Sequence, residues 1–344
     1  MQKEKRYFSR EYSLAVILME GNIRLINRLQ KGRQDIFNKK RNCLAKGCSE
    51  AAIKSHVLQR KRILNNITDD TNHFYGIWYP NIHDFDTHGS FNIKKIGLNE
   101  GYSFYGFCSN HDNDIFLPIE THPIDFTNKH ILRLFTYRTI CLEYRKKQIY
   151  YEQGKDVLAA LKEIEPNKLH YLNNGPAYLA LNDLEFYKSQ LEEELESTTS
   201  SNFDYEVITL NEKKICFSSP LTIYDPSNEH TWEYDKYGVE RTEPLATSIW
   251  NFFPYGGKSY LIVATHKKYK CRWAEDMKTA FKEAKNVDKL ISDFLTYRLE
   301  FWGISPSIYE TLSQQAIADF LLESRMNWDN YDYTIKTNFN LFAS

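Results

Sequence analysis

The stretch Cys43-Leu-Ala-Lys-Gly-Cys48 decides how the first third of this chain can fold. A Ser55-His56 pair follows it closely, and a second ligand pair comes much later, in Phe107-Cys-Ser-Asn-His-Asp112. Two close pairs of cysteine and histidine suit tetrahedral zinc, because each pair forms a short turn that brings both donors to one ion. The sequence therefore predicts a structural Zn²⁺ site with the ligands Cys43, Cys48, Cys108 and His111.

The surrounding segment supports a metal site of this kind. Gly47 fits the turn between the first two cysteines. Residues 38 to 118 have weak hydrophobic periodicity and many Asn, Asp, Gly and His residues, which suits a loop-rich unit held by metal rather than by a large core. A Cys-x4-Cys pair with a distant Cys-x2-His pair is looser than a doubled Cys-x2-Cys motif, so two unrelated pairs of buried residues remain the alternative.

Positive charge is concentrated in residues 1 to 65, which hold sixteen lysines and arginines against five acidic residues, although the whole chain has a formal net charge of -1. Lysine and arginine displace counterions from a nucleic-acid backbone, so basic charge beside a metal site favours contact with phosphates. The alternative is a solvated basic helix face. The residues predicted to contact nucleic acid are Lys39, Lys40, Arg41, Lys54, Arg60, Lys61 and Arg62.

Composition excludes several classes of protein. Of the 344 residues, 42% are hydrophobic and 26% are charged, and no run approaches the roughly 18 apolar residues of a membrane span, so we expect no membrane association. The apolar stretch from 14 to 19 is short and is followed by Glu20, unlike a cleaved leader. Six cysteines are too few for a secreted disulfide scaffold of this length, which predicts a cytoplasmic protein. We expect core packing for Cys141, Cys216 and Cys271.

The combination of Cys-x4-Cys, a Ser-His pair ending eight residues later, and Phe-Cys-x2-His-Asp followed by Ile-Phe and Pro-Ile-Glu resembles a known family. It is similar to the bacterial HNH-type nucleases, also called ββα-metal nucleases, whose zinc finger has the treble-clef fold. The resemblance covers about residues 40 to 120 and is weaker from Arg133 to Tyr144.

The resemblance implies roles for two more residues. His56 falls at the position of the general base, where an imidazole with an ordinary pKa near 6.5 accepts a proton from the attacking water. Asp112, directly after His111, falls where the family binds a divalent ion, so the resemblance implies catalytic Mg²⁺ or Mn²⁺ at this carboxylate.

The chain departs from the family pattern at one position of the motif. Ser103 stands where the middle asparagine is expected, and a hydroxyl orients a histidine less rigidly than an amide does. The connection from His56 to Cys108 is also long. An alternative therefore stays open, in which Ser55-His56 only supports the zinc ligands and Asp112 caps a helix in a finger that binds without cleaving.

Hydrophobic patterns along the rest of the chain predict an α+β protein. Tyr255-Gly-Gly-Lys258 is expected to connect two strands as a hairpin. The expected regions are a basic N-terminal helix (1–37), a zinc-binding HNH-like module (38–125), a helical segment (126–199), a small antiparallel β-rich region (200–270) and a C-terminal helical region (271–344).

These observations predict a metal-dependent endonuclease that hydrolyses DNA phosphodiester bonds. The resemblance further suggests bacterial defence against phage, with a protein partner that senses the invader; homo-oligomers are compatible with this prediction. The alternative is a non-catalytic zinc finger that binds DNA or a partner protein. An assembly subunit without nucleic-acid contact would leave the basic segment unexplained. The loop histidines His73, His83 and His88 are expected to be solvated rather than metal ligands.

Overall fold

The computed structural model describes residues 31–32, 34–77, 92–121, 123–161, 176–197, 201–223, 243–270, 272–327, 332 and 334–343. Most of the expected basic N-terminal helix (1–37) lies outside these residues, as do His83, His88 and Cys271. Within the described residues the protein combines helices with antiparallel sheets, which agrees with the predicted α+β class. No helix among them is long and apolar enough to cross a membrane.

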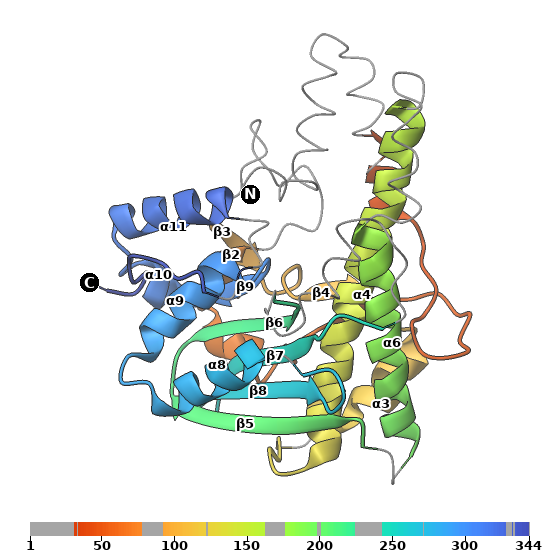
Figure 1. Ribbon diagram of the computed structural model, residues 1–344, viewed down its shortest axis with the longest axis horizontal. Helices are drawn as coiled ribbons and strands as arrows, with labels where there is room; N and C mark the ends of the chain where they lie inside the picture. The colour runs from red at the N-terminus through yellow and green to blue at the C-terminus, as the bar shows by residue number, and fades with distance from the viewer. Residues whose placement is uncertain are drawn as a thin grey trace.

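A seven-stranded sheet forms the centre of the molecule (Figure 1). Its order is β3-β2-β9-β6-β7-β8-β5, and every neighbouring pair is antiparallel. The strands are β2 (His73–Ile77), β3 (Lys94–Gly97), β5 (Phe203–Asn211), β6 (Ile215–Leu221), β7 (Ser248–Tyr255), β8 (Lys258–His266) and β9 (Trp302–Ile304).

The hairpin between β7 and β8 forms where the sequence predicts it. Tyr255 pairs with Lys258, and the two glycines between them have positive φ angles of 59° and 76°. Two consecutive residues in the left-handed region match the twist of the flanking strands, and glycine adopts this region without steric cost. The predicted hairpin connection is thus confirmed.

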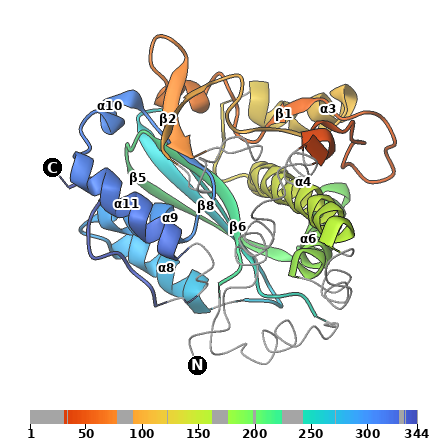
Figure 2. The ribbon, with the colours of Figure 1, turned by 90° about the horizontal axis from the view of Figure 1, so that it is seen from above.

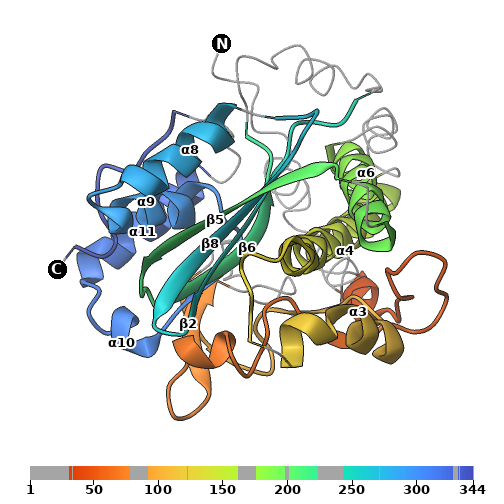
Figure 3. The ribbon, with the colours of Figure 1, turned by 90° about the horizontal axis from the view of Figure 1, so that it is seen from below.

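Helices cover both faces of the sheet (Figures 2 and 3). On one face lie α4 (Lys129–Leu161) and α6 (Pro176–Glu196), which pack against each other. On the other lie α8 (Arg272–Glu283), α9 (Val287–Tyr297) and α11 (Gln314–Met326), with the short α10 (Pro306–Tyr309) at the sheet's edge. Side chains on β7 alternate between the two layers: Trp250 contacts Trp273 of α8, whereas Phe253 contacts Phe135 of α4.

A separate small unit lies beside α4. It consists of the two-stranded sheet of β1 (Lys54–His56) and β4 (Ser103–Tyr105), followed by α3 (Ser109–Thr121). The 3-10 helix η1 (Leu64–Ile67) leads from this unit to β2. Arg145 of α4 ties the unit to the main body, because its buried guanidinium donates hydrogen bonds to the carbonyls of Tyr105 and Asn42.

The large sheet contains strands from three of the regions expected from the sequence. Four of its strands lie in the β-rich region from 200 to 270, as expected, but β2 and β3 come from the segment assigned to the zinc-binding module. Strand β9 comes from the segment expected to be helical. It lies between β2 and β6, so these distant segments share one hydrogen-bonded sheet.

Candidate metal centre

The first half of the centre is the turn that carries Cys43 and Cys48. Gly47 has a positive φ of 73°, which the turn requires. The amide of Cys48 donates to the carbonyl of Ala45, and the amide of Ala45 lies 3.4 Å from Sγ of Cys43. A bridge between Asn42 and Ala51 closes the loop at its base. Local hydrogen bonds therefore hold the two sulfurs on the same side of the turn.

The second half lies at the start of α3. Cys108 directly precedes the helix, and His111 lies in its first turn. The pairing of β1 with β4 places the end of β4 beside the first turn, since the amide of Ile53 donates to the carbonyl of Phe107 and that of Leu44 donates to the carbonyl of Gly106. The sheet thus brings together two ligand pairs that lie 60 residues apart in the chain.

The four side chains converge. Their ligand atoms all lie within 4.8 Å of one another, and among the described residues this is the only such group of three or more Cys, His, Asp or Glu side chains. Sγ of Cys48 lies 3.9 Å from Sγ of Cys108, and Nδ1 of His111 lies 3.2 Å from Sγ of Cys108 and 3.5 Å from Sγ of Cys43. Tetrahedral zinc with Zn–S bonds of about 2.3 Å requires sulfur separations of about 3.8 Å. The Cys₃His cluster can hold a metal ion and is compatible with zinc.

The thiols differ in their environments. Burial raises the pKa of Cys43 to about 11, whereas a hydrogen bond from the backbone amide of His111 lowers the pKa of Cys108 to about 7. Metal ligation requires thiolates, so an ion at this centre would supply the positive charge that stabilises the deprotonated form of the buried Cys43.

His56 ends β1, opposite Ser103 of β4. Its half-buried ring places Nε2 3.4 Å from the carbonyl oxygen of Leu98. Burial lowers the pKa of His56, and the positive charges of Arg138 and Arg60 lower it further; the Leu98 contact and the charge of Glu120 act in the opposite direction. The hydroxyl of Ser103 donates to the carbonyl of Glu100, and the His56 ring makes its contact with the Leu98 carbonyl.

Asp112 lies in the first turn of α3 and is paired with a residue that the sequence analysis did not single out. Nη2 of Arg138 lies 3.4 Å from Oδ1 of Asp112, and Nη1 lies 2.7 Å from Oε1 of Glu120 at the other end of α3. The guanidinium also stacks 4.0 Å from the centre of the Phe116 ring. His56 and Asp112 therefore share Arg138 as a neighbour, but they do not belong to a three-ligand cluster.

The sequence predicted no role for Arg138 or Glu120, although Glu120 ends the Pro-Ile-Glu run and Arg138 lies in the weaker part of the resemblance. They lie 18 residues apart, in different helices, and neither stands in a recognisable spacing with His56. The available signal was weak: Arg138 interrupts the apolar pattern of α4 between Tyr137 and Thr139, where a charged residue needs a partner.

Most of the predicted nucleic-acid contacts are exposed, with two exceptions. Lys39, Lys40, Lys54, Arg60 and Lys61 are exposed. Arg41 is buried, pairs with Glu152 of α4 and donates to the carbonyl of Ile36, so its charge is directed at a protein partner. Arg62 is half-buried and donates to the carbonyl of Thr121 at the end of α3.

The other candidate residues in the described part of the chain are Cys141, Cys216 and His73. Cys141 and Cys216 are fully buried, and burial raises the pKa of both thiols, as expected for core packing. His73 starts β2, and its Nδ1 lies 3.0 Å from the hydroxyl of Thr71. None of these three belongs to the four-ligand cluster.

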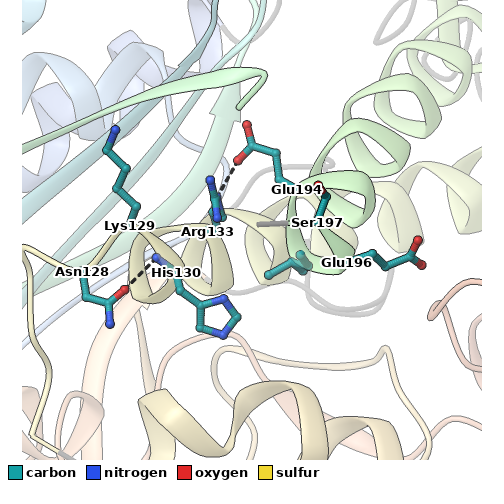
Figure 4. Close-up of a pocket in the computed structure, with 8 residues that line it drawn as sticks. Asn128, Lys129, His130, Arg133, Glu194, Glu196 and Ser197 are labelled. Atoms are coloured by element: carbon teal, nitrogen blue, oxygen red, sulfur yellow. Dashed lines mark hydrogen bonds and ion pairs between the residues drawn. The ribbon is translucent and has the colours of Figure 1, made fainter. Parts of the chain in front are cut away.

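A hollow of about 490 Å³ lies between the start of α4 and the end of α6 (Figure 4). Arg133 points toward Glu194 and pairs with it at 2.7 Å, and Glu196 pairs with Lys46 of the Cys43–Cys48 turn at 3.3 Å. Most of the charges around the hollow are therefore paired within the protein. The lining residues are Asn128, Lys129, His130, Arg133, Glu194, Leu195, Glu196 and Ser197.

Comparisons of the chain with protein-family models, with curated proteins and with solved structures found no match.

Proposed function

We propose that this protein is a zinc-containing endonuclease of the ββα-metal type, which hydrolyses DNA phosphodiester bonds with a divalent cation. The observation that carries the proposal is the order and pairing of the small unit: a cysteine turn, β1 antiparallel to β4, then α3, with the four ligands at one end. This is the arrangement expected of a treble-clef finger. His56 lies on β1 and Asp112 lies in the first turn of α3.

His56 is the general base in this proposal. A lowered pKa keeps its imidazole neutral at pH 7, and a neutral imidazole accepts the proton of the water that attacks phosphorus. The contact of Nε2 with the Leu98 carbonyl fixes the ring if Nε2 carries the proton, and Nδ1 is then the accepting atom.

Asp112 is the proposed ligand of Mg²⁺ or Mn²⁺. Hard cations prefer carboxylate oxygens, and the Asp112 side chain is 23% exposed, so solvent reaches it. The bound cation would stabilise negative charge on the leaving oxygen. Cys43, Cys48, Cys108 and His111 would hold Zn²⁺ as a structural ion, and the exposed cations near β1 would contact phosphates.

A second function is favoured by one specific observation. Arg138 occupies the Asp112 carboxylate, which is the contact expected if Asp112 stabilises α3 and does no chemistry. In that case the finger binds DNA or a partner protein without cleaving. Both functions predict bound zinc, and only the first predicts hydrolysis, so hydrolysis separates them.

A plasmid-nicking assay with Mg²⁺ or Mn²⁺ tests the proposal. We expect His56→Ala to reduce nicking about 10²-fold or more, because it removes the base, while zinc content and DNA affinity stay near wild type. His73→Ala is the matched control, since His73 lies on β2 outside the cluster. Nicking that survives in His56→Ala would exclude the mechanism. DNA binding without nicking by the wild type would support the second function.

DNA binding is tested separately by its salt dependence. If several exposed lysines and arginines contact phosphates, the logarithm of affinity should fall steeply with the logarithm of salt concentration, by about 0.9 for each phosphate contacted. Replacing the exposed Lys54 by Gln should reduce this slope by about one contact. A flat salt response would contradict a role for these residues in phosphate binding.

A further inference from the structure

Arg138 lies between two carboxylates of α3, those of Asp112 and Glu120. Its side chain is only 1% exposed, and its terminal nitrogens pair with Asp112 at 3.4 Å and with Glu120 at 2.7 Å. Stacking on Phe116 covers the guanidinium plane. One buried cation is thus shared by two acidic side chains from opposite ends of the same helix.

The two carboxylates remain open to solvent on their other sides. The Asp112 side chain is 23% exposed and that of Glu120 is 35% exposed. Solvent therefore reaches the acids while the cation that neutralises them stays buried. An ion arriving from solvent meets the carboxylates first.

Two buried polar atoms in this cluster have no hydrogen-bond partner among the described residues. They are Nε of Arg138 and Oε1 of Gln59, whose amide nitrogen donates to the carbonyl of Glu120. Buried polar groups are nearly always paired with protein or ordered water. An ordered water at each of these atoms would supply the missing hydrogen bond.

Electrostatics determines how such an ion would bind. A divalent cation at Asp112 lies close to the positive charge of Arg138, and the repulsion is poorly screened because the guanidinium is buried. Oδ1 of Asp112, which pairs with the guanidinium, is also one of the two oxygens that a cation held by both oxygens of this carboxylate would bind. Binding of the ion therefore requires that the Arg138–Asp112 pair opens.

We propose that Arg138 is an autoinhibitory counter-cation: it occupies Asp112 and Glu120 in the protein without substrate, and a divalent cation binds at Asp112 only by displacing it. The inference rests on the proposed function for the role of Asp112 and adds how that site is controlled. The arginine keeps the cation affinity low until the ion pair is broken.

Mn²⁺ binding to the full, zinc-loaded chain, measured by calorimetry without DNA, tests this inference. Arg138→Met should bind Mn²⁺ about tenfold tighter than wild type or more, because the competing charge is gone. Arg138→Lys keeps the charge and should stay within about twofold of wild type. Adding Asp112→Asn to Arg138→Met should remove the gain. Zinc content, measured for each variant, establishes that the metal centre is intact.

Equal Mn²⁺ affinity in wild type and Arg138→Met overturns the inference, as does a gain that survives Asp112→Asn. Should Arg138→Met lack zinc, Glu120→Gln replaces it: the guanidinium then pairs with Asp112 alone, so Mn²⁺ affinity should fall, and unchanged or tighter binding would contradict the proposal. The Mn²⁺ measurement contains no DNA, so it is independent of the nicking assay. If the Mn²⁺ affinities change as predicted but the wild type does not nick DNA, this inference stands and the endonuclease proposal is rejected. If the wild type nicks DNA but the Mn²⁺ affinities do not change as predicted, the endonuclease proposal stands and this inference is rejected.

Discussion

The small unit around the Cys₃His cluster and the seven-stranded sheet are held together in different ways. In the small unit β1 and β4 have three residues each, and its largest aromatic contacts, those of Phe107 and Phe116, are completed by Tyr137 of α4. The sheet has strands of up to nine residues and buries Trp250 and Trp302 completely. Two-stranded sheets are marginal in water, so we expect the small unit to depend on ligation and on its contacts with α4. The seven-stranded sheet is stabilised by the large side chains that it buries on both of its faces.

The largest expected effect follows from removing a ligand. Cys108→Ser should lose the metal and, with it, the order of residues 42–56 and 102–121, because zinc ligation contributes on the order of 10 kcal/mol to folding of such sites. The strands β5 to β8 should stay protected. Elemental analysis and hydrogen exchange measure both. Cys216→Ala is the matched control, since this buried cysteine is no member of the cluster, and soluble folded wild type without zinc would contradict the prediction.

The next effect concerns the core of the sheet. Trp250 is fully buried against the aromatic rings of Trp273 and Phe294, so Trp250→Ala should lower the free energy of unfolding by about 3–5 kcal/mol. Its zinc content should not change, because Trp250 packs against α8 and α9, on the face of the sheet opposite α4 and the small unit (Figure 2). Urea denaturation and elemental analysis test the two statements. Loss of zinc in this variant would show that the two regions depend on one core.

A smaller effect is expected inside the seven-stranded sheet, where β2 pairs with β9. Gly76 of β2 pairs with Gly303 of β9, and a Cβ at Gly76 would lie 2.1 Å from the backbone oxygen of Trp302. Gly76→Ala should therefore push β2 from the sheet and cost about 1–3 kcal/mol. Gly97→Ala on the neighbouring strand is the control, because its Cβ would meet nothing closer than 3.8 Å. Equal stability of the two variants in urea would contradict the close approach.

The smallest effect concerns the pH dependence of stability through His56. Its folded pKa lies below the ordinary value of 6.5, chiefly because of burial, so its contribution is fully present above pH 6.5. As the pH falls below 6.5, the unfolded chain takes up the proton before the folded protein does. The free energy of unfolding therefore decreases until the pH has passed the folded pKa of His56. His56→Gln should lose less stability than wild type between pH 8 and pH 5.5. Parallel unfolding free energies for the two proteins across this range would show that the pKa is not lowered.

The fold was predictable where the signal lies within a short segment. The run Tyr255-Gly-Gly-Lys258 predicts its hairpin because consecutive positive φ angles need glycine. The segment from 302 to 304 was expected to continue a helical region, yet Trp302, Gly303 and Ile304 form β9. Three residues carry too little periodicity to distinguish a strand, and their partners in β2 and β6 lie far away in the chain.

Local spacing was enough to predict the four side chains that converge, because Cys-x4-Cys and Cys-x2-His each place two donors on one turn. Only the tertiary structure decided that Arg138 pairs with Asp112 and Glu120, and that Arg41 turns inward to Glu152. The sequence gives the charge of each side chain but does not say which opposite charge it pairs with. That choice depends on the packing of α3 and of the segment before β1 against α4, which brings residues 18 to 111 positions apart into one low-dielectric environment.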